Sequence, residues 1–430
     1  MARNRALHAV RVLAPLLATL LVVAALWGGS ASATSTPPPT PVGPHHSPSP
    51  FPTVLRTPRP RPTPPRIAAG AAVLEDMRTG QILYAKQATQ RRPVASLTKI
   101  MTALLVLRRS NLNDIVSVDA EAAHTPPSNL QLKVGEQLSV RDLMDGMLLS
   151  SANDAAVALA EHVSGDVGAF VGLMNRTARR LGMRHTHFAS PNGLVDSGYS
   201  TARDLATLTA AAYANREFRS MVGTQFATIP GPPGKPDRHL QNRNVLLWLY
   251  RGATGVKTGF TVAAGWCLIA EANRAGRHLV AVVLGDPSQG ASFSDAATLL
   301  NYGFREFRPA LLAVAGETAG AVLLDGEPVT AAADDRLIRL VREGRLADVR
   351  SAFVPGPHAS LPVKAGDRIG VLRFLDGRYI LGSVPLVATQ AAAAPPPGAP
   401  APPPADLAPP VQSALRLLYA AGRSTLGALL

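Results

Sequence analysis

Residues 95–103 read Ala-Ser-Leu-Thr-Lys-Ile-Met-Thr-Ala, and they combine a helical pattern with two reactive side chains. Apolar residues recur here and just beyond at helical spacing: Leu97, Ile100, Met101, Leu104 and Leu105. That spacing predicts a helix with one buried face. Ser96 and Lys99 lie three residues apart, so they share a face of this helix and can reach each other.

A serine hydroxyl is a poor nucleophile until a base removes its proton. Lys99 could be that base if burial lowers its pKa, because desolvation disfavours the charged amine. At the start of a helix, backbone N–H groups also favour developing negative charge beside Ser96. A helix cap followed by a surface lysine explains the same residues, so this motif is informative only together with others.

A second polar motif, Ser151-Ala152-Asn153, falls where the helical pattern of residues 140–163 is interrupted. Its hydroxyl and amide could relay a proton and hold a substrate amide, and a polar loop is the simpler interpretation. A third motif, Lys257-Thr258-Gly259, precedes an apolar run that begins at Trp266. On an edge strand, its lysine and hydroxyl could bind a carboxylate while the glycine lets a substrate backbone come close. A turn between strands is the alternative.

The elements around these motifs predict an α+β domain at residues 68–304. Apolar runs separated by turn residues indicate two hairpins: 71–74 with 81–84, and 266–273 with 278–284. Further helical patterns cover two segments, 201–214 and 295–302. Hairpins combined with helices indicate a mainly antiparallel sheet that is flanked by helices.

From residue 305 to residue 389, short apolar runs alternate with turn residues, which predicts a small, mostly β domain. Asp376-Gly377 is a hairpin-turn signal within it. Proline-rich stretches at residues 34–67 and 390–410 cannot build a packed core, so we expect both to be linkers.

Residues 1–33 show the three parts of a secretory signal peptide. These are basic residues, an apolar run and a cleavage site: Arg3, Arg5 and Arg11, then Val12 to Trp27, then Ala31-Ser32-Ala33. Retention as an N-terminal anchor is the alternative. Both interpretations export the rest of the chain to the cell wall or the outer face of the cytoplasmic membrane. Residues 411–430 are apolar and fit either an amphipathic helix on a membrane surface or a helix without a partner.

The formal charge of +14 favours polyanionic partners. Export and the lack of an aromatic–basic binding motif argue against nucleic acid, which leaves acidic wall polymers and anionic lipid. Part of the charge is arginine in the proline-rich stretch 34–67, where it is simply solvated. The single cysteine, Cys267, cannot form an internal disulfide, and its apolar surroundings predict a small buried side chain.

In this order, Ser-x-x-Lys, Ser-x-Asn and Lys-Thr-Gly form the signature of penicillin-binding proteins and serine β-lactamases. From about residue 68 to residue 304 the chain resembles the low-molecular-mass D-alanyl-D-alanine carboxypeptidases. Besides the three motifs, four stretches carry the resemblance: Pro191-Asn192-Gly193-Leu194, Tyr199 to Ala206, Asn242-Arg243-Asn244 and Gly255 to Thr261. It implies a penicillin-binding, serine β-lactamase-like fold followed by a β domain.

The implied activity is a serine carboxypeptidase that removes the terminal D-alanine from peptidoglycan stem pentapeptides and is acylated by β-lactam antibiotics. Ser96 would be the nucleophile, Lys99 the general base and Ser151 a proton relay. Substrate binding would fall to a further set of residues: Asn153, Arg243, Lys257, Thr258 and Gly259. Backbone N–H groups of Ser96 and Phe260 would form the oxyanion hole. The resemblance implies neither a metal nor an organic cofactor.

Two positions depart from the family pattern and bear on substrate binding. Thr254 stands where an Asp is frequent, and Ser292 lies near the place where many relatives carry an Arg. A β-lactamase is one alternative, but class A enzymes need a glutamate for deacylation. The interval between the second and third motifs holds only Glu161 and Glu217, neither followed four residues later by Asn. A transpeptidase differs only in its acyl acceptor, and the intact motifs argue against a catalytically decayed wall-binding protein.

Overall fold

The computed structural model describes residues 63–394. The predicted signal peptide, residues 1–33, and the predicted amphipathic segment, residues 411–430, lie outside the described residues, as do most of the two proline-rich linkers. Among the described residues, no single helix has the length and hydropathy of a membrane span. Helices α4 (Asn153–Ser164) and α5 (Val167–Arg180) pass that test only as a pair, across a bend of 84°.

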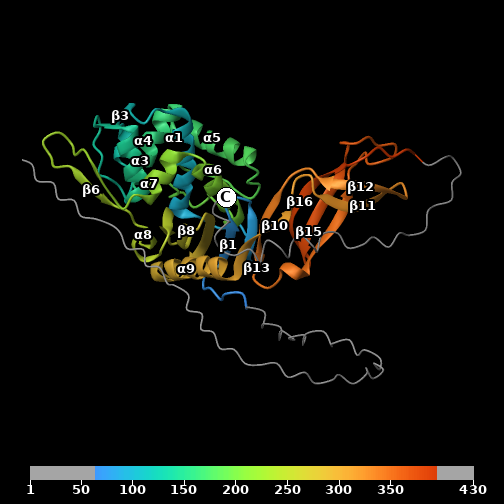
Figure 1. Ribbon diagram of the computed structural model, residues 1–430. Coiled ribbons are helices and arrows are strands. Elements are labelled where there is room, and N and C mark those ends of the chain that lie inside the picture. The colour runs from blue at the N-terminus through green and yellow to red at the C-terminus, as the bar shows by residue number, and fades with distance from the viewer. Residues whose placement is uncertain (1–62, 395–430) are drawn as a thin grey trace, which may run out of the picture. The chain divides into compact units, whose positions relative to one another are not determined.

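The larger part of the described chain (Figure 1) is built on a five-stranded sheet, whose strands have the order β2-β1-β9-β8-β7. Its strands, in chain order, are β1 (Ala71–Asp76), β2 (Gln81–Lys86), β7 (Ala253–Thr261), β8 (Gly265–Arg274) and β9 (Arg277–Asp286). All neighbours pair antiparallel, so both predicted hairpins form. Strand β7, which carries the Lys-Thr-Gly motif, is an edge strand of this sheet.

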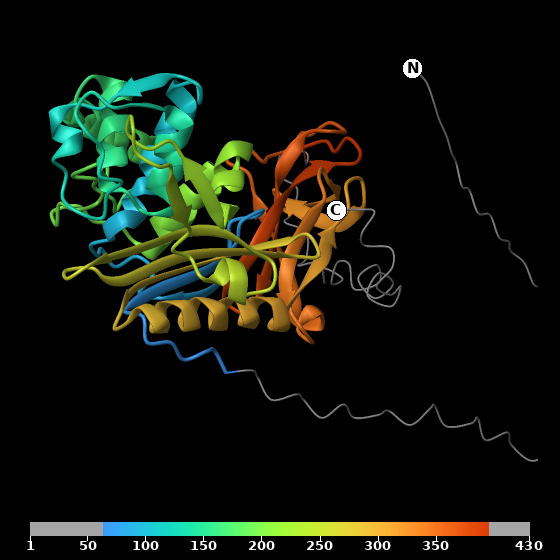
Figure 2. The same ribbon diagram turned by 90° about the vertical axis from the view of Figure 1, so that its left-hand side faces the viewer.

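Helices cover both faces of the sheet. Helix α9 (Gln289–Glu306) runs along one face and packs on β8 and β9 (Figure 2). The other face carries a helical group: α1 (Lys99–Arg109), α3 (Val140–Leu149), α4, α5, α6 (Ala202–Tyr213) and α7 (Arg216–Gly223). Shorter elements complete this part: α2 (Ala120–Ala123), α8 (Leu246–Leu249), and the hairpins β3 (Ile115–Ser117) with β4 (Gln137–Ser139) and β5 (Phe226–Ile229) with β6 (Arg238–Gln241).

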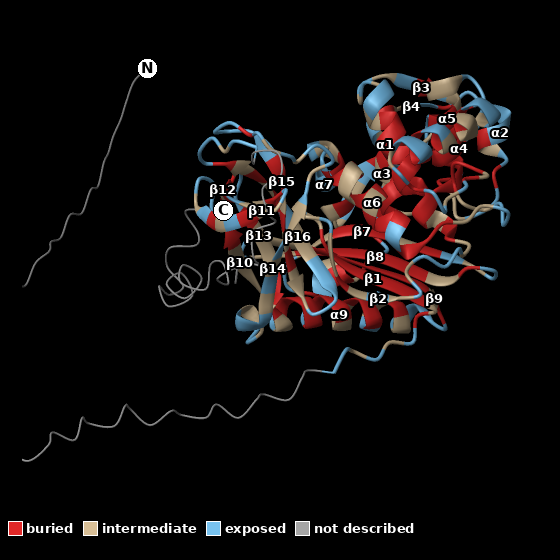
Figure 3. Cartoon of the chain, turned by 90° about the vertical axis from the view of Figure 1, so that its right-hand side faces the viewer, coloured by how far each residue is buried: buried red, intermediate tan, exposed pale blue. Residues whose placement is uncertain are grey.

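Side chains of β1 alternate between two hydrophobic cores, as a strand buried on both faces requires. Ala71 and Val73 pack with the helical group, whereas Ala72 and Leu74 pack towards α9. Figure 3 shows the central strands as buried almost throughout. The sheet is therefore a rigid platform from which β7 can present its motif.

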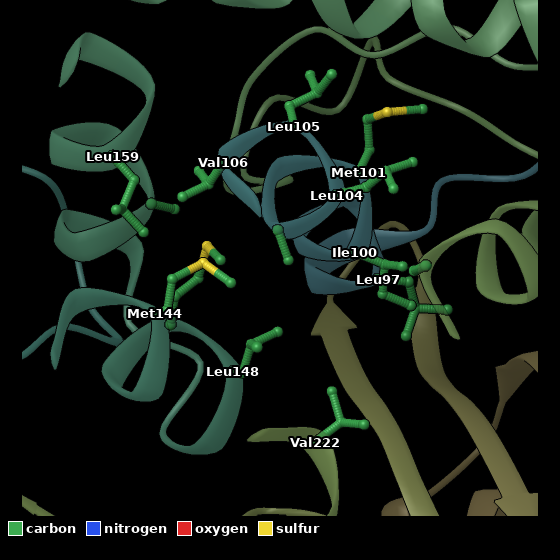
Figure 4. Close-up of a cluster of buried hydrophobic side chains, with 14 of the residues drawn as sticks. Leu97, Ile100, Met101, Leu104, Leu105, Val106, Met144, Leu148, Leu159 and Val222 are labelled. Atoms are coloured by element: carbon green, nitrogen blue, oxygen red, sulfur yellow. The ribbon is translucent and has the colours of Figure 1, made fainter. Parts of the chain in front are cut away.

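Helix α1 is buried on every side in its first two turns, although the sequence pattern predicts a single buried face. All residues from Lys99 to Val106 are buried, and α1 contacts α3, α4, α5, α6 and α7 (Figure 4). A helix that is enclosed by others needs no polar face. Only Arg108 and Arg109, in its last turn, lead the chain back to solvent.

Residues 307–388 form two further sheets, as the alternating pattern predicts. One pairs β10 (Phe307–Ala313) with β13 (Leu337–Arg342). The other has the order β11-β12-β16-β15-β14, with bounds β11 (Thr318–Leu324), β12 (Glu327–Ala333), β14 (Val349–Pro355), β15 (Arg368–Asp376) and β16 (Tyr379–Ala388). Gly377, with φ +59°, makes the predicted turn between the last two strands.

A glutamine links the two parts of the chain. The side chain of Gln81 donates a hydrogen bond of 2.7 Å to the Leu340 carbonyl and accepts one of 2.9 Å from the Leu340 N–H. Phe307 and the Leu340 side chain also belong to the hydrophobic core beneath α9. The core of the first part therefore continues beyond residue 304.

Two carboxyl groups lie together where β9 leads into α9. Asp286 is only 2 % exposed, and among the described residues no N–H or hydroxyl group donates a hydrogen bond to either of its oxygens. Asp295 accepts a hydrogen bond of 2.8 Å from the N–H of Ala69. Burial, followed by the neighbouring Asp295, raises the pKa of Asp286 to about 8, although Lys86 opposes the shift. Asp286 is therefore protonated at neutral pH and can donate to Asp295.

We predict that Asp286→Asn stabilises the protein at alkaline pH. The folded pKa of Asp286 lies above its unfolded value, so its contribution to stability is complete at low pH and disappears as pH rises to about 8. An amide donates to Asp295 at every pH and escapes this loss. The difference in melting temperature between variant and wild type should increase by at least about 2 °C in favour of the variant as pH rises from about 5 to about 9. A difference that does not change with pH, or one also given by the exposed Asp237→Asn, would contradict the shared proton.

Candidate active site

Ser96 lies in a 3₁₀ turn, Ala95–Thr98 (η1), immediately before α1. Strand β7 passes directly beside this turn. A Cβ added to Gly259 would lie 3.2 Å from the backbone nitrogen of Ser96 and 3.1 Å from the carbonyl oxygen of Val94. Only glycine allows so close an approach without displacing the backbone of the turn. The first and third sequence motifs are thus brought into contact.

Lys99 is fully buried, and its Nζ has three oxygen neighbours. It lies 2.8 Å from Ser96 Oγ, 2.7 Å from Asn153 Oδ1 and 2.8 Å from the carbonyl oxygen of Asn192. Burial, followed by the positive charges of Lys257 and Arg243, holds the pKa of Lys99 well below its usual range. This environment therefore shifts the balance from the ammonium towards the neutral amine.

A neutral amine has two N–H donors and one lone pair. The amide oxygens of Asn153 and Asn192 can only accept, so they take the two donors of Lys99. The lone pair is then left for the remaining neighbour, the hydroxyl of Ser96. This arrangement can remove the proton of a serine nucleophile, which is the task of a general base.

The second motif occupies the break between α3 and α4. Ser151 has a left-handed backbone with φ +64°, and Asn153 is the first residue of α4. The carboxylate of Asp154, which is 1 % exposed, accepts hydrogen bonds from the backbone N–H groups of Leu130 and Leu132. The segment before β4 is thereby fixed to the start of α4, so that Asn153 is held in position at Lys99.

Lys257 adds a second buried cation. It is 1 % exposed, and Nζ donates a hydrogen bond of 3.1 Å to the carbonyl oxygen of Thr258. Burial, followed by the charge of Arg243, lowers the pKa of Lys257 to about 7. The backbone N–H of Arg243 donates to the Leu149 carbonyl at 3.2 Å, which ties it to the end of α3. The charges of Lys257 and Arg243 repel each other, so the site favours an anion such as a carboxylate.

Phe260 follows directly on the point where β7 meets the Ser96 turn. Its side chain is 48 % exposed, and its ring packs on Trp266 of β8 with centroids 4.4 Å apart. This contact and the strand pairing hold its backbone next to the nucleophile. Two backbone N–H groups in such a position can stabilise an oxyanion.

Comparison with known proteins agrees with this arrangement. Residues 59–288 match the family model described as D-alanyl-D-alanine carboxypeptidase. The chain belongs to this family. It is 35 % identical over 346 residues to the carboxypeptidase DacD of Escherichia coli, covering 76 % of this chain and 88 % of the relative. It is 38 % identical over 270 residues to the carboxypeptidase of Streptomyces sp. strain K15, covering 59 % of this chain and 92 % of the relative.

Solved structures lead to the same family and fold. Penicillin binding protein 5 of Haemophilus influenzae aligns with a TM-score of 0.64 at 30 % identity, over 76 % of this chain and 99 % of that structure. A structure of the Streptomyces K15 DD-transpeptidase aligns with a TM-score of 0.53 at 38 % identity, over 56 % of this chain and 99 % of its own length. The predicted α+β, penicillin-binding fold is thus confirmed, and the chain is a serine-type D-Ala-D-Ala carboxypeptidase.

The sequence motifs assigned no role to two residues of the carboxypeptidase site, Asn192 and Gly193. The Asn192 carbonyl is the third partner of Lys99. Gly193, with φ +83°, packs so tightly that a Cβ would lie 2.0 Å from the Ala95 carbonyl oxygen. Both belong to the Pro-Asn-Gly-Leu stretch. The sequence signal that could have identified them was a glycine next to a polar residue within this motif.

The two departures from the family pattern make hydrogen bonds to groups other than the lysines and Arg243 of the site. The hydroxyl of Thr254 donates to the buried carboxylate of Glu271, which also pairs with His278 Nδ1 at 2.9 Å. This hydrogen bond thus holds the start of β7 against β8. Ser292 is 2 % exposed and donates to the Gln289 carbonyl in the first turn of α9.

The lowered pKa of Lys257 predicts the pH profile of acylation by penicillin. The second-order rate constant should fall as pH rises through about 7, because Lys257 then loses the charge that attracts the drug's carboxylate. In Lys257→Arg the guanidinium keeps its charge, so this fall should shift upward by at least about 1.5 pH units even if the rate itself decreases. Stopped-flow measurement of the acylation rate across pH locates this fall in each protein. The profile of the exposed Lys235→Arg should not move; an unmoved profile in Lys257→Arg would contradict the assignment.

Proposed function

We propose that this carboxypeptidase forms its acyl-enzyme on Ser96 with neutral Lys99 as general base. The observation that carries the proposal is the amine of Lys99, whose two donors are occupied by amide oxygens and whose lone pair is left for the Ser96 hydroxyl. As Ser96 Oγ bonds to the carbonyl carbon between the two D-alanines, its proton passes to Lys99. The oxyanion forms against the backbone N–H groups of Ser96 and Phe260.

The tetrahedral intermediate then expels the terminal D-alanine. Its leaving amine takes a proton, which we assign to Ser151 as relay from the protonated Lys99. A water molecule, deprotonated by Lys99, attacks the acyl-enzyme and releases the shortened peptide and Ser96. Asn153 would orient the acyl chain while it holds Lys99.

Substrate selection rests on the free carboxylate of the terminal D-alanine. Lys257 and Arg243 would attract this carboxylate, and the Thr258 hydroxyl, half-buried on the edge strand, would donate to it. Gly259 leaves room for the substrate backbone beside β7. The same contacts explain acylation by β-lactams, whose carboxylate lies in the corresponding place.

The wider setting follows from the substrate. We propose that the protein acts outside the cytoplasm on peptidoglycan stem peptides, with residues 1–33 as export signal and residues 34–67 and 390–410 as linkers. Residues 68–304 would be the catalytic domain, residues 305–389 a small β-rich C-terminal domain, and residues 411–430 a contact with the membrane surface. The D-alanine-specific family supports the location, because its substrate is a wall polymer.

Transfer of the acyl group to another amine is a second candidate outcome of the same intermediate. The observation that favours it is the Streptomyces K15 relative, 38 % identical, whose structure is that of a DD-transpeptidase. Both reactions share the Ser96 acyl-enzyme and differ in the acceptor.

A fluorescent penicillin tests the proposal directly. The full chain should give a labelled band on a denaturing gel, and Ser96→Ala should abolish it because the acylated atom is gone. Ser220→Ala, at an exposed serine on α7, should label like the wild type. Label that persists in a folded Ser96→Ala protein would place the acylated residue elsewhere, and no label on the folded wild type would remove the penicillin-binding activity.

A further inference from the structure

A small, open concavity adjoins the turn that carries the nucleophile. Three segments line it: residues 93–98, residues 189–198 and Thr261 at the end of β7. Ala95 and Thr98, on either side of Ser96 in the same turn, are among the lining residues. The concavity therefore shares its wall with the turn that carries Ser96.

The wall formed by residues 189–198 is well fixed. The N–H of Gly193 donates a hydrogen bond of 3.0 Å to Ser190 Oγ, and its Cα lies against the Ala95 carbonyl. The N–H of Gly198 donates to the Val195 carbonyl at 3.1 Å, which closes a tight turn. Asp196 lies inside this turn, so its position is set by the fold.

Charge divides the site into two ends. Lys257 and Arg243 form the cationic end. The concavity has one charged lining residue, the carboxylate of Asp196, which is exposed and takes part in none of the ion pairs of residues 63–394. A substrate that spans both ends would carry a carboxylate at one and a cation at the other.

An apolar side chain adjoins the carboxylate in the sequence. Val195, the neighbour of Asp196, also lines the concavity and is 48 % exposed. Such a group suits the methylene chain of an amine-bearing side chain, which buries its stem and keeps its charge at a polar partner. A carboxylate next to an exposed valine is a fitting partner for an alkyl ammonium.

We propose that Asp196 binds the side-chain ammonium of the residue that precedes the two D-alanines, and so selects stem peptides whose diamino acid is not crosslinked. The inference rests on the proposed function, since the peptide must be attacked at Ser96. With the terminal carboxylate at Lys257 and Arg243, the chain on the other side of the reacting carbonyl extends towards the concavity. A crosslinked or acylated amine is neutral and gains nothing from Asp196.

Two peptides differing in one charge test this. Nα-acetyl-Lys-D-Ala-D-Ala has a free side-chain ammonium, and its Nε-acetylated form is neutral. The full-length wild type should show kcat/KM about three- to tenfold higher for the charged peptide, an advantage that shrinks as salt rises. Asp196→Asn should remove the preference and leave kcat/KM for the neutral peptide unchanged. The matched control Asp237→Asn, at an exposed carboxylate in the loop between β5 and β6, should keep it.

Charge reversal sharpens the test. Asp196→Lys should prefer the Nε-succinylated peptide, which carries a negative charge, over the ammonium form. Equal rates for the charged and neutral peptides in the wild type, or a preference that survives Asp196→Asn, would overturn the role of Asp196. Fluorescent-penicillin labelling of each variant separates the two levels: absence of label and of hydrolysis in the wild type would refute the proposed function, whereas normal label without discrimination refutes only this inference.

Discussion

The buried amine of Lys99 constrains more of this structure than any other group. Burial disfavours the ammonium form of Lys99, and the charges of Lys257 and Arg243 disfavour it further, while three oxygen atoms surround the amine. Each oxygen comes from a different element: the 3₁₀ turn, the start of α4 and the segment before α6. These three elements must dock together for the amine to be satisfied.

The central sheet supplies the opposite wall. Its strands are buried on both faces, which makes β7 a stable edge despite its exposed outer side. Gly259 then sets how close that edge comes to the nucleophile. The Thr254–Glu271 hydrogen bond fixes the start of the strand, so the position of Lys257 depends on packing at both ends. Electrostatic interactions and backbone geometry thus both determine the arrangement of the region where β7 meets the Ser96 turn.

The sequence predicted the motif residues, the hairpins and the two-part organisation because each depends on local spacing. The carbonyl of Asn192 could not be found in this way, since every residue has a backbone acceptor and only the fold decides which one meets a buried amine. The burial of the first two turns of α1 on every side was missed because the number of helices that surround them is a tertiary property. The direction of the Thr254 side chain likewise depends on Glu271, a cross-strand neighbour 17 residues away.

The continuity of the core beneath α9 has a practical meaning for dissection of this chain. Phe307 and Leu340, which lie beyond residue 304, complete that core. The side-chain amide of Gln81 also makes two hydrogen bonds to the backbone of Leu340, as a neighbouring strand would. The Streptomyces K15 structure is matched over 99 % of its length by 56 % of this chain, so a relative folds without a counterpart to the remainder. Removal of the β domain from this chain would expose apolar residues of the core beneath α9. A soluble minimal enzyme would need polar substitutions at those residues.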